Sequence, residues 1–155
     1  MATLGNTSAG GDYISNTGGY VAISVTPSVD VVVNDLNAYL AQSNQDGGGV
    51  YAKAVIWDSN YNVVTNSIGS SINITSIYDT WYTLATYSLK PVLLANNTYW
   101  IGLAVSTPIA PHLHVYESDG APGCRAVSAG TYDPVGAFSS TSYVDDYIEV
   151  YITVE

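Results

Sequence analysis

Residues 143–154 read YVDDYIEVYITV, and this stretch decides the fold class. From Ile148 to Val154 every second side chain is apolar, and the positions between them carry tyrosine, glutamate or threonine. Side chains two residues apart lie on the same side of a β-strand, so the alternation predicts a strand with one face in a hydrophobic core. Asp146 is the one polar residue on the apolar side.

The same alternation recurs upstream. It is clear at 20–25, 50–57 and 99–105, and shorter runs are found at 62–67, 68–75, 81–88 and 112–116. In residues 29–41 the apolar side chains change parity part-way, which predicts a β-bulge near Asn34 and Asp35. About nine short strands separated by turn residues, with no helical periodicity, predict an all-β, antiparallel β-sandwich.

The length of the chain fits a single domain. The 155 residues suffice for a single hydrophobic core, so residues 1–155 are expected to form one domain. The polar segment 1–12 is expected to be flexible or to exchange as a strand with a neighbouring copy. Its first residues lack the basic and apolar regions of a signal peptide, so either a signal was removed or none existed.

The charge balance excludes two classes of partner. The formal net charge is -10, and the fixed cations are Lys53, Lys90 and Arg125. Nucleic-acid binding needs a basic surface that neutralises phosphates, and no basic stripe is present. We therefore expect neither nucleic-acid binding nor membrane insertion. The single cysteine, Cys124, excludes an intramolecular disulfide.

The sequence offers little for catalysis. The chain has two histidines and no Gly-x-Ser-x-Gly motif, so no acid-base pair or nucleophile can be assigned. We expect no enzymatic activity and no cofactor. His112 and His114 are two residues apart on a predicted strand, so both could ligate one zinc or copper ion. The alternative is a pair of exposed strand histidines, because no third ligand is identifiable.

The last strand also predicts a binding face. Its second parity carries tyrosines, which stack on sugar rings, together with carboxylates, which accept hydrogen bonds from hydroxyl groups. The residues are Tyr143, Asp145, Tyr147, Glu149 and Tyr151. Trp57 and Trp81 allow the same argument. Such a face would suit a glycan or a protein partner, and the alternative is that these rings only cover neighbouring strands.

Several motifs resemble a known family. They are LGNT (4–7), AVIWD (54–58), TW (80–81), LANNTYWIGL (94–103) and YIEVYI (147–152). Together they resemble a jelly-roll-like β-sandwich family of short phage-type and virus-type structural proteins and of modules in secreted bacterial proteins. The resemblance implies a jelly-roll-like sandwich without catalysis, located outside the cell or on a virion surface.

The resemblance also implies a structural calcium ion. A carboxylate on the apolar side of a strand needs a partner or a cation, and calcium prefers oxygen ligands. Asp146, with Asp145 or Asp12, is the ligand set that the resemblance suggests. The alternative is that Asp146 lies at a frayed sheet edge.

Two functions follow from the sequence. The first is a structural or interaction protein of a virion or extracellular assembly, such as a capsid decoration, fibre or filament subunit, that self-associates or binds a surface protein. It is motivated by sheet edges that have few lysines to guard them. The alternative is a carbohydrate-binding module that recognises glycans through tyrosine, tryptophan and carboxylates on one sheet face.

Overall fold

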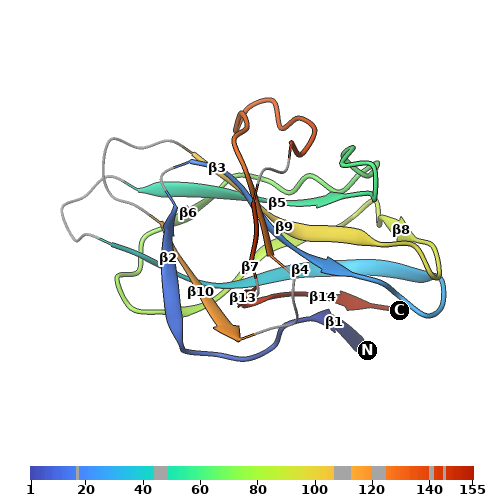
Figure 1. Cartoon of the computed structure of the whole chain (residues 1–155), viewed down its shortest axis with the longest axis horizontal. Helices are drawn as coiled ribbons and strands as arrows, with labels where there is room; N and C mark the ends of the chain where they lie inside the picture. Colours follow the sequence, from blue (N-terminus) through green and yellow to red (C-terminus); the bar gives the residue numbers. More distant parts are fainter. Residues whose placement is uncertain (17, 44–48, 107–112, 120–124, 140–141, 145) are drawn as a thin grey trace.

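The predicted all-β sandwich is confirmed. The computed structural model describes residues 1–16, 18–43, 49–106, 113–119, 125–139, 142–144 and 146–155. In these ranges the chain forms fourteen strands, more than the nine or so expected. They pair antiparallel in an eight-stranded and a six-stranded sheet that face each other (Figure 1). Within the same ranges, no helix is long and apolar enough to cross a membrane.

The larger sheet is built around β4, which pairs with β7, β8, β14 and β10. The N-terminal strands complete it, because β1 pairs with β14 and β2 pairs with β10. Its strands are β1 (Ala2–Gly5), β2 (Asp12–Asn16), β4 (Val31–Gln42), β7 (Thr80–Thr86), β8 (Val92–Leu93), β10 (Leu113–Asp119), β13 (Asp146–Ile148) and β14 (Val150–Val154).

The smaller sheet has the order β12, β11, β3, β9, β5, β6. Its strands are β3 (Gly19–Val25), β5 (Val50–Trp57), β6 (Ile72–Ile74), β9 (Tyr99–Val105), β11 (Arg125–Ser128) and β12 (Ser142–Val144). Two predicted strands differ from the structure. Residues 62–67 form only an isolated bridge at Val63, and Asn66 has a positive φ of 63°, which breaks an extended strand. The run 68–75 shortens to β6.

The main core lies between the two sheets and follows the predicted alternation. Ile101 and Leu103 of β9 face Val150 and Ile152 of β14 across the core, and all four are fully buried. On β4, the inward parity changes after Val33, as predicted. Val154 pairs with Val33 and Thr153 with Asp35, so Asn34 is an extra residue between them. The predicted bulge is therefore confirmed.

A second cluster covers the outer face of the smaller sheet. The segment 129–139, the orange loop above this sheet in Figure 1, packs Phe138 against Trp57 and Tyr20. The Trp57 indole N–H donates to the Gly136 carbonyl at 3.0 Å, and the Tyr20 hydroxyl donates to the Thr131 carbonyl at 2.6 Å. The chain itself thus covers this part of the outer face.

The predicted single strand 143–154 is wrong. Its first part, β12, pairs with β11 in the smaller sheet, whereas β13 and β14 belong to the larger sheet. The chain then bends at Glu149, where β4 and β10 meet it: the Tyr39 amide donates to the Glu149 carbonyl, and the Glu149 amide donates to the Tyr116 carbonyl. In the sequence, Val144 has the same parity as the apolar residues from Ile148 to Val154, so the alternation alone does not reveal the change of sheet.

The N-terminal segment is docked on its own sheet in this structure. Asn6 is 5% exposed, and its side-chain amide donates to the Ser118 hydroxyl at 2.9 Å and to the Tyr147 carbonyl at 2.8 Å. Its backbone amide donates to the Val150 carbonyl. Segment 1–12 therefore fills an edge of the sheet without a second chain, and strand exchange stays a prediction.

Candidate functional site

The outer face of the larger sheet carries one aromatic side chain on each of four adjacent strands. We call Tyr13, Tyr116, Tyr39 and Trp81 the aromatic ladder. Tyr13 of β2 lies opposite Tyr116 of β10, and Tyr39 of β4 lies opposite Trp81 of β7. Successive ring centroids are 5.7, 5.3 and 5.2 Å apart. The ladder therefore crosses the sheet at a right angle to the strands.

Two further rings, from β10 and β14, flank the ladder. The His114 ring stacks on Tyr13, with centroids 3.9 Å apart and planes 17° apart. Tyr151 contacts Trp81 edge-on, with centroids 5.0 Å apart. Tyr13 is 50% exposed and the remaining rings are partly exposed. A continuous aromatic surface therefore reaches solvent on this face.

Local sequence explains why the rings point outward. On β10, Leu113 and Val115 are buried in the main core, so His114 between them and Tyr116 after them must face the other side. On β4, Ala38 and Leu40 point inward, and Tyr39 points outward for the same reason. The bulge at Asn34 and Asp35 sets the parity of β4 that places Tyr39 on this face.

Asp79 adds a carboxylate beside the ladder. It accepts a hydrogen bond from the Tyr39 hydroxyl at 2.7 Å. This hydrogen bond, with smaller contributions from partial burial and nearby charges, raises the pKa of Tyr39 to about 12. Burial, followed by the charge of Asp79, also raises the pKa of Tyr116. Both phenols thus remain protonated at neutral pH and can donate hydrogen bonds.

Glu149 is a buried carboxyl group next to these phenols. Its side chain is 0% exposed, and its Oε2 accepts a hydrogen bond from the Gly10 amide at 3.1 Å. Its Oε1 has no hydrogen-bond partner among the described residues. Burial raises the pKa of Glu149, the Gly10 hydrogen bond opposes this, and the charge of Asp79 adds to it. The predicted exposed acceptor is in fact a group shielded from solvent.

A Glu149→Gln variant tests this burial. A raised pKa in the folded state makes the wild type lose stability as pH rises from the ordinary value of 4.5 through the folded pKa. Glutamine cannot ionise, so the variant should match the wild type near pH 4 and be more stable near pH 8. Thermal unfolding of both proteins across this range measures the difference. A difference that does not change with pH would contradict the assignment.

A polar row continues the same face away from the rings. The Asp35 carboxylate accepts hydrogen bonds from the Thr86 and Thr153 hydroxyls at 2.8 and 2.9 Å. The Thr83 hydroxyl donates to the Asn37 side-chain oxygen at 2.7 Å. These polar side chains form hydrogen bonds with one another across the strands. The aromatic ladder is therefore the part of this face whose side chains we consider for ligand contact.

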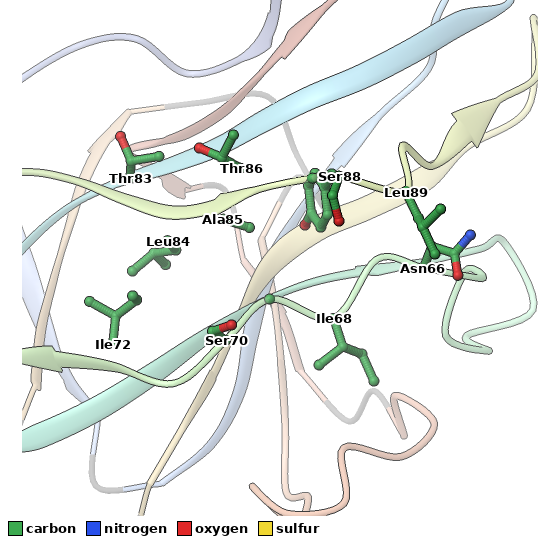
Figure 2. A pocket seen from close by; sticks show the side chains of 12 residues that line it. Asn66, Ile68, Ser70, Ile72, Thr83, Leu84, Ala85, Thr86, Ser88 and Leu89 are labelled. Carbon is green, nitrogen blue, oxygen red and sulfur yellow. The ribbon is translucent and has the colours of Figure 1, made fainter.

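A cleft of about 560 Å³ opens between the edge of β7 and residues 66–72. Figure 2 shows its two sides, with Ile68, Ser70 and Ile72 facing β7. Its lining contains no charged residue, and its one titratable group is Tyr87, whose hydroxyl donates to the Ser67 carbonyl at 2.9 Å. Burial raises the pKa of Tyr87. The lining of the cleft thus contains no carboxylate, imidazole or amine that could act as a general acid or base.

The structure brings together only part of the predicted binding face. Trp81 and Tyr151 contact each other on the outer face of the larger sheet, and Glu149 is buried. Tyr147 packs against the main core. Tyr143 belongs to the other sheet through β12, and nothing is described of its side chain.

Trp57 was expected on a binding face, and this is wrong. Its side chain is 0% exposed beneath the segment 129–139, with the indole N–H bonded to Gly136. A period-two pattern tells which side of a strand a residue occupies, but not whether that side is covered, and at Trp57 both sides of β5 are covered. Trp57 is therefore a core residue.

The structure describes only part of the predicted metal ligands, since nothing is described of the Asp146 side chain. Strand register places Asp12 opposite Glu117, and Asp146 opposite Asp119. No group of three or more His, Cys, Asp or Glu side chains among the described residues is arranged to hold a metal ion. His112, Cys124 and Asp145 lie outside the described residues, and His114 stacks on Tyr13.

Three of the four ladder residues were missed by sequence reasoning. Tyr39 lies between buried residues of a predicted strand, so its outward direction was readable. Tyr13 directly follows the segment 1–12, which was expected to be flexible, and Tyr116 lies at the end of a short predicted strand. What joins them is pairing between strands far apart in sequence.

Comparison with protein-family models, with curated proteins and with solved structures found no match. The resemblance to a jelly-roll-like family therefore stays a prediction. The function must be argued from the residues of the candidate site.

Proposed function

We propose that this chain is a non-catalytic domain that binds a carbohydrate on the aromatic ladder. The observation that carries the proposal is the row of one solvent-reaching ring on each of four adjacent strands. Aromatic rings offer an apolar face to the C–H groups of a sugar, and their hydroxyls offer hydrogen bonds at the rim. The Asp79 carboxylate can accept hydrogen bonds from sugar hydroxyls beside Tyr39. An extracellular or virion-surface location is part of the proposal.

The alternative of a self-assembling subunit has a weaker physical basis than the sequence suggested. It rested on sheet edges without guarding lysines. Among the described strands, β6 and β12 have three residues each and β1 has four, and short edge strands limit edge-to-edge pairing. The edge strand β7 carries an irregularity, because Leu36 pairs with Ala85 and Asn37 with Thr83. Bulges of this kind also protect an edge.

Binding to an immobilised glycan array tests the proposal. We expect the labelled wild-type protein to bind at least one class of glycan. Trp81→Ala should weaken that binding by about thirtyfold, because truncating a large aromatic contact residue costs about 2 kcal/mol or more. Tyr39→Phe should weaken it less, because it removes only the hydroxyl.

Tyr78→Ala is the matched control. Tyr78 is 75% exposed and lies outside the ladder, so its truncation should leave glycan binding unchanged. Thermal unfolding should show that all variants remain folded. A wild-type protein that binds no glycan, or equal losses in Trp81→Ala and Tyr78→Ala, would overturn the proposal.

A further inference from the structure

We infer that the ligand is a linear, uncharged oligosaccharide that lies across the strands, along the ladder from Tyr13 to Trp81. This inference rests on the proposed function and specifies the ligand class and direction. It is carried by the register of the rings, by their spacing and by the charges around them.

The direction follows from strand register. Directly opposed residues of antiparallel strands lie on a line across the sheet, and Tyr13 opposes Tyr116 as Tyr39 opposes Trp81. Val115 opposes Leu40, which places the next residues, Tyr116 and Tyr39, side by side and joins the two pairs. A ligand that contacts all four rings must therefore follow this line. A ligand lying along a strand would meet one ladder ring only.

The spacing favours an extended chain over a compact ligand. From Tyr13 to Trp81 the successive ring centroids are 5.7, 5.3 and 5.2 Å apart, close to the strand separation of about 4.7–4.9 Å. The ladder thus repeats a similar contact at regular intervals across β2, β10, β4 and β7. A polymer of similar units can repeat the same interaction at each interval, whereas a single small ring can use only part of it.

The negative charges around the ladder favour an uncharged ligand over an anionic one. Asp79 lies beside the ladder and accepts a hydrogen bond from Tyr39. The negative charge of Glu149 adds to the causes that raise the pKa of Tyr39 and of Tyr116. The described lysines are engaged elsewhere: Lys53 pairs with Asp133 at 3.3 Å, and Lys90 pairs with Glu155 at 2.7 Å. With a net charge of -10, the chain repels anionic sugars at this face.

Titration calorimetry with oligosaccharides of defined length tests the inference. The probes are neutral gluco- and xylo-oligosaccharides, from disaccharide to hexasaccharide, and acidic oligogalacturonides of the same lengths. We expect affinity for one neutral series to rise with length and then level off once the ladder is covered. The oligogalacturonides should bind about tenfold more weakly or worse at low salt.

Variants at the two ends of the ladder test the direction. Tyr13→Ala and Trp81→Ala should each lower the affinity for the hexasaccharide and make the rise with length stop earlier. Tyr78→Ala should leave the whole length series unchanged. Asp79→Asn should narrow the difference between neutral and acidic probes, since it removes one negative charge beside the ladder.

The outcomes separate the inference from the proposed function. A neutral series whose affinity already levels off at the disaccharide, or acidic probes that bind as tightly as neutral ones, would overturn the inference while glycan binding stands. An unchanged length dependence in Tyr13→Ala would overturn the ligand direction. Absence of binding to all of these probes and to the wider array would overturn the proposed function itself.

Discussion

A Trp57→Ala variant is expected to lose about 3–5 kcal/mol of its free energy of unfolding. Trp57 is 0% exposed and packs its ring against Tyr20 and Phe138, with centroids 5.2 and 5.1 Å away. Truncation removes these contacts, leaves a cavity and takes away the indole N–H that the Gly136 carbonyl accepts. Such a loss is a large share of the stability of a domain, which is about 5–15 kcal/mol.

Urea unfolding measures this loss, and limited proteolysis adds a local readout. The segment 129–139 is held to the sheet by Trp57, Tyr20 and Phe138, so protease cleavage within it should accelerate in the variant. Trp81→Ala is the matched control, because its ring lies partly exposed on the opposite outer face. A stability loss as large in Trp81→Ala as in Trp57→Ala would contradict the placement of the two tryptophans.

A Gly102→Ala variant is expected to be destabilised by about 3 kcal/mol or more, at or above the usual cost of overpacking. Gly102 lies in β9, between Ala22 of β3 and Val55 of β5. A methyl group there would lie 2.0 Å from the Val21 carbonyl oxygen and 2.6 Å from the Ala22 Cα. Because both are backbone atoms of a central strand, room can be made only by displacing the sheet.

Gly136→Ala is the control for this prediction. A methyl group at Gly136 would meet only the Tyr20 hydroxyl, at 3.9 Å, so the substitution should be nearly neutral. Denaturant unfolding and soluble yield of the two variants give the comparison. Equal stabilities for Gly102→Ala and wild type would show that β3 and β9 are not packed as closely as described.

Much of the fold could be predicted because it depends on local geometry. The alternation in β9 and β14 predicted their buried faces, and the parity change in 29–41 predicted the bulge at Asn34 and Asp35. Both are consequences of how consecutive side chains alternate along an extended backbone. Turn residues between the runs then favoured many short antiparallel strands over helices.

The candidate site was only partly predictable, because it depends on which strands become neighbours. Trp81 and Tyr151 contact each other on the outer face of the larger sheet, but Tyr143 belongs to the other sheet and Tyr147 packs on the core. The same pattern of tyrosines along one strand is compatible with all of these positions.

The sequence by itself determined the β-sandwich class, the anionic surface and the parity of each long strand, since these follow from composition and from contacts between near neighbours. Only the tertiary structure decided that Trp57 is buried and Trp81 exposed, that Glu149 lies at a junction of strands, and that Tyr13, Tyr116 and Tyr39 align. The physical reason is that strand pairing joins residues more than a hundred positions apart, such as Tyr13 and Tyr116. Which face of a sheet is covered depends on the path of the whole chain. Here the segment 129–139 packs on the outer face of the smaller sheet, and the ladder on the outer face of the larger sheet reaches solvent.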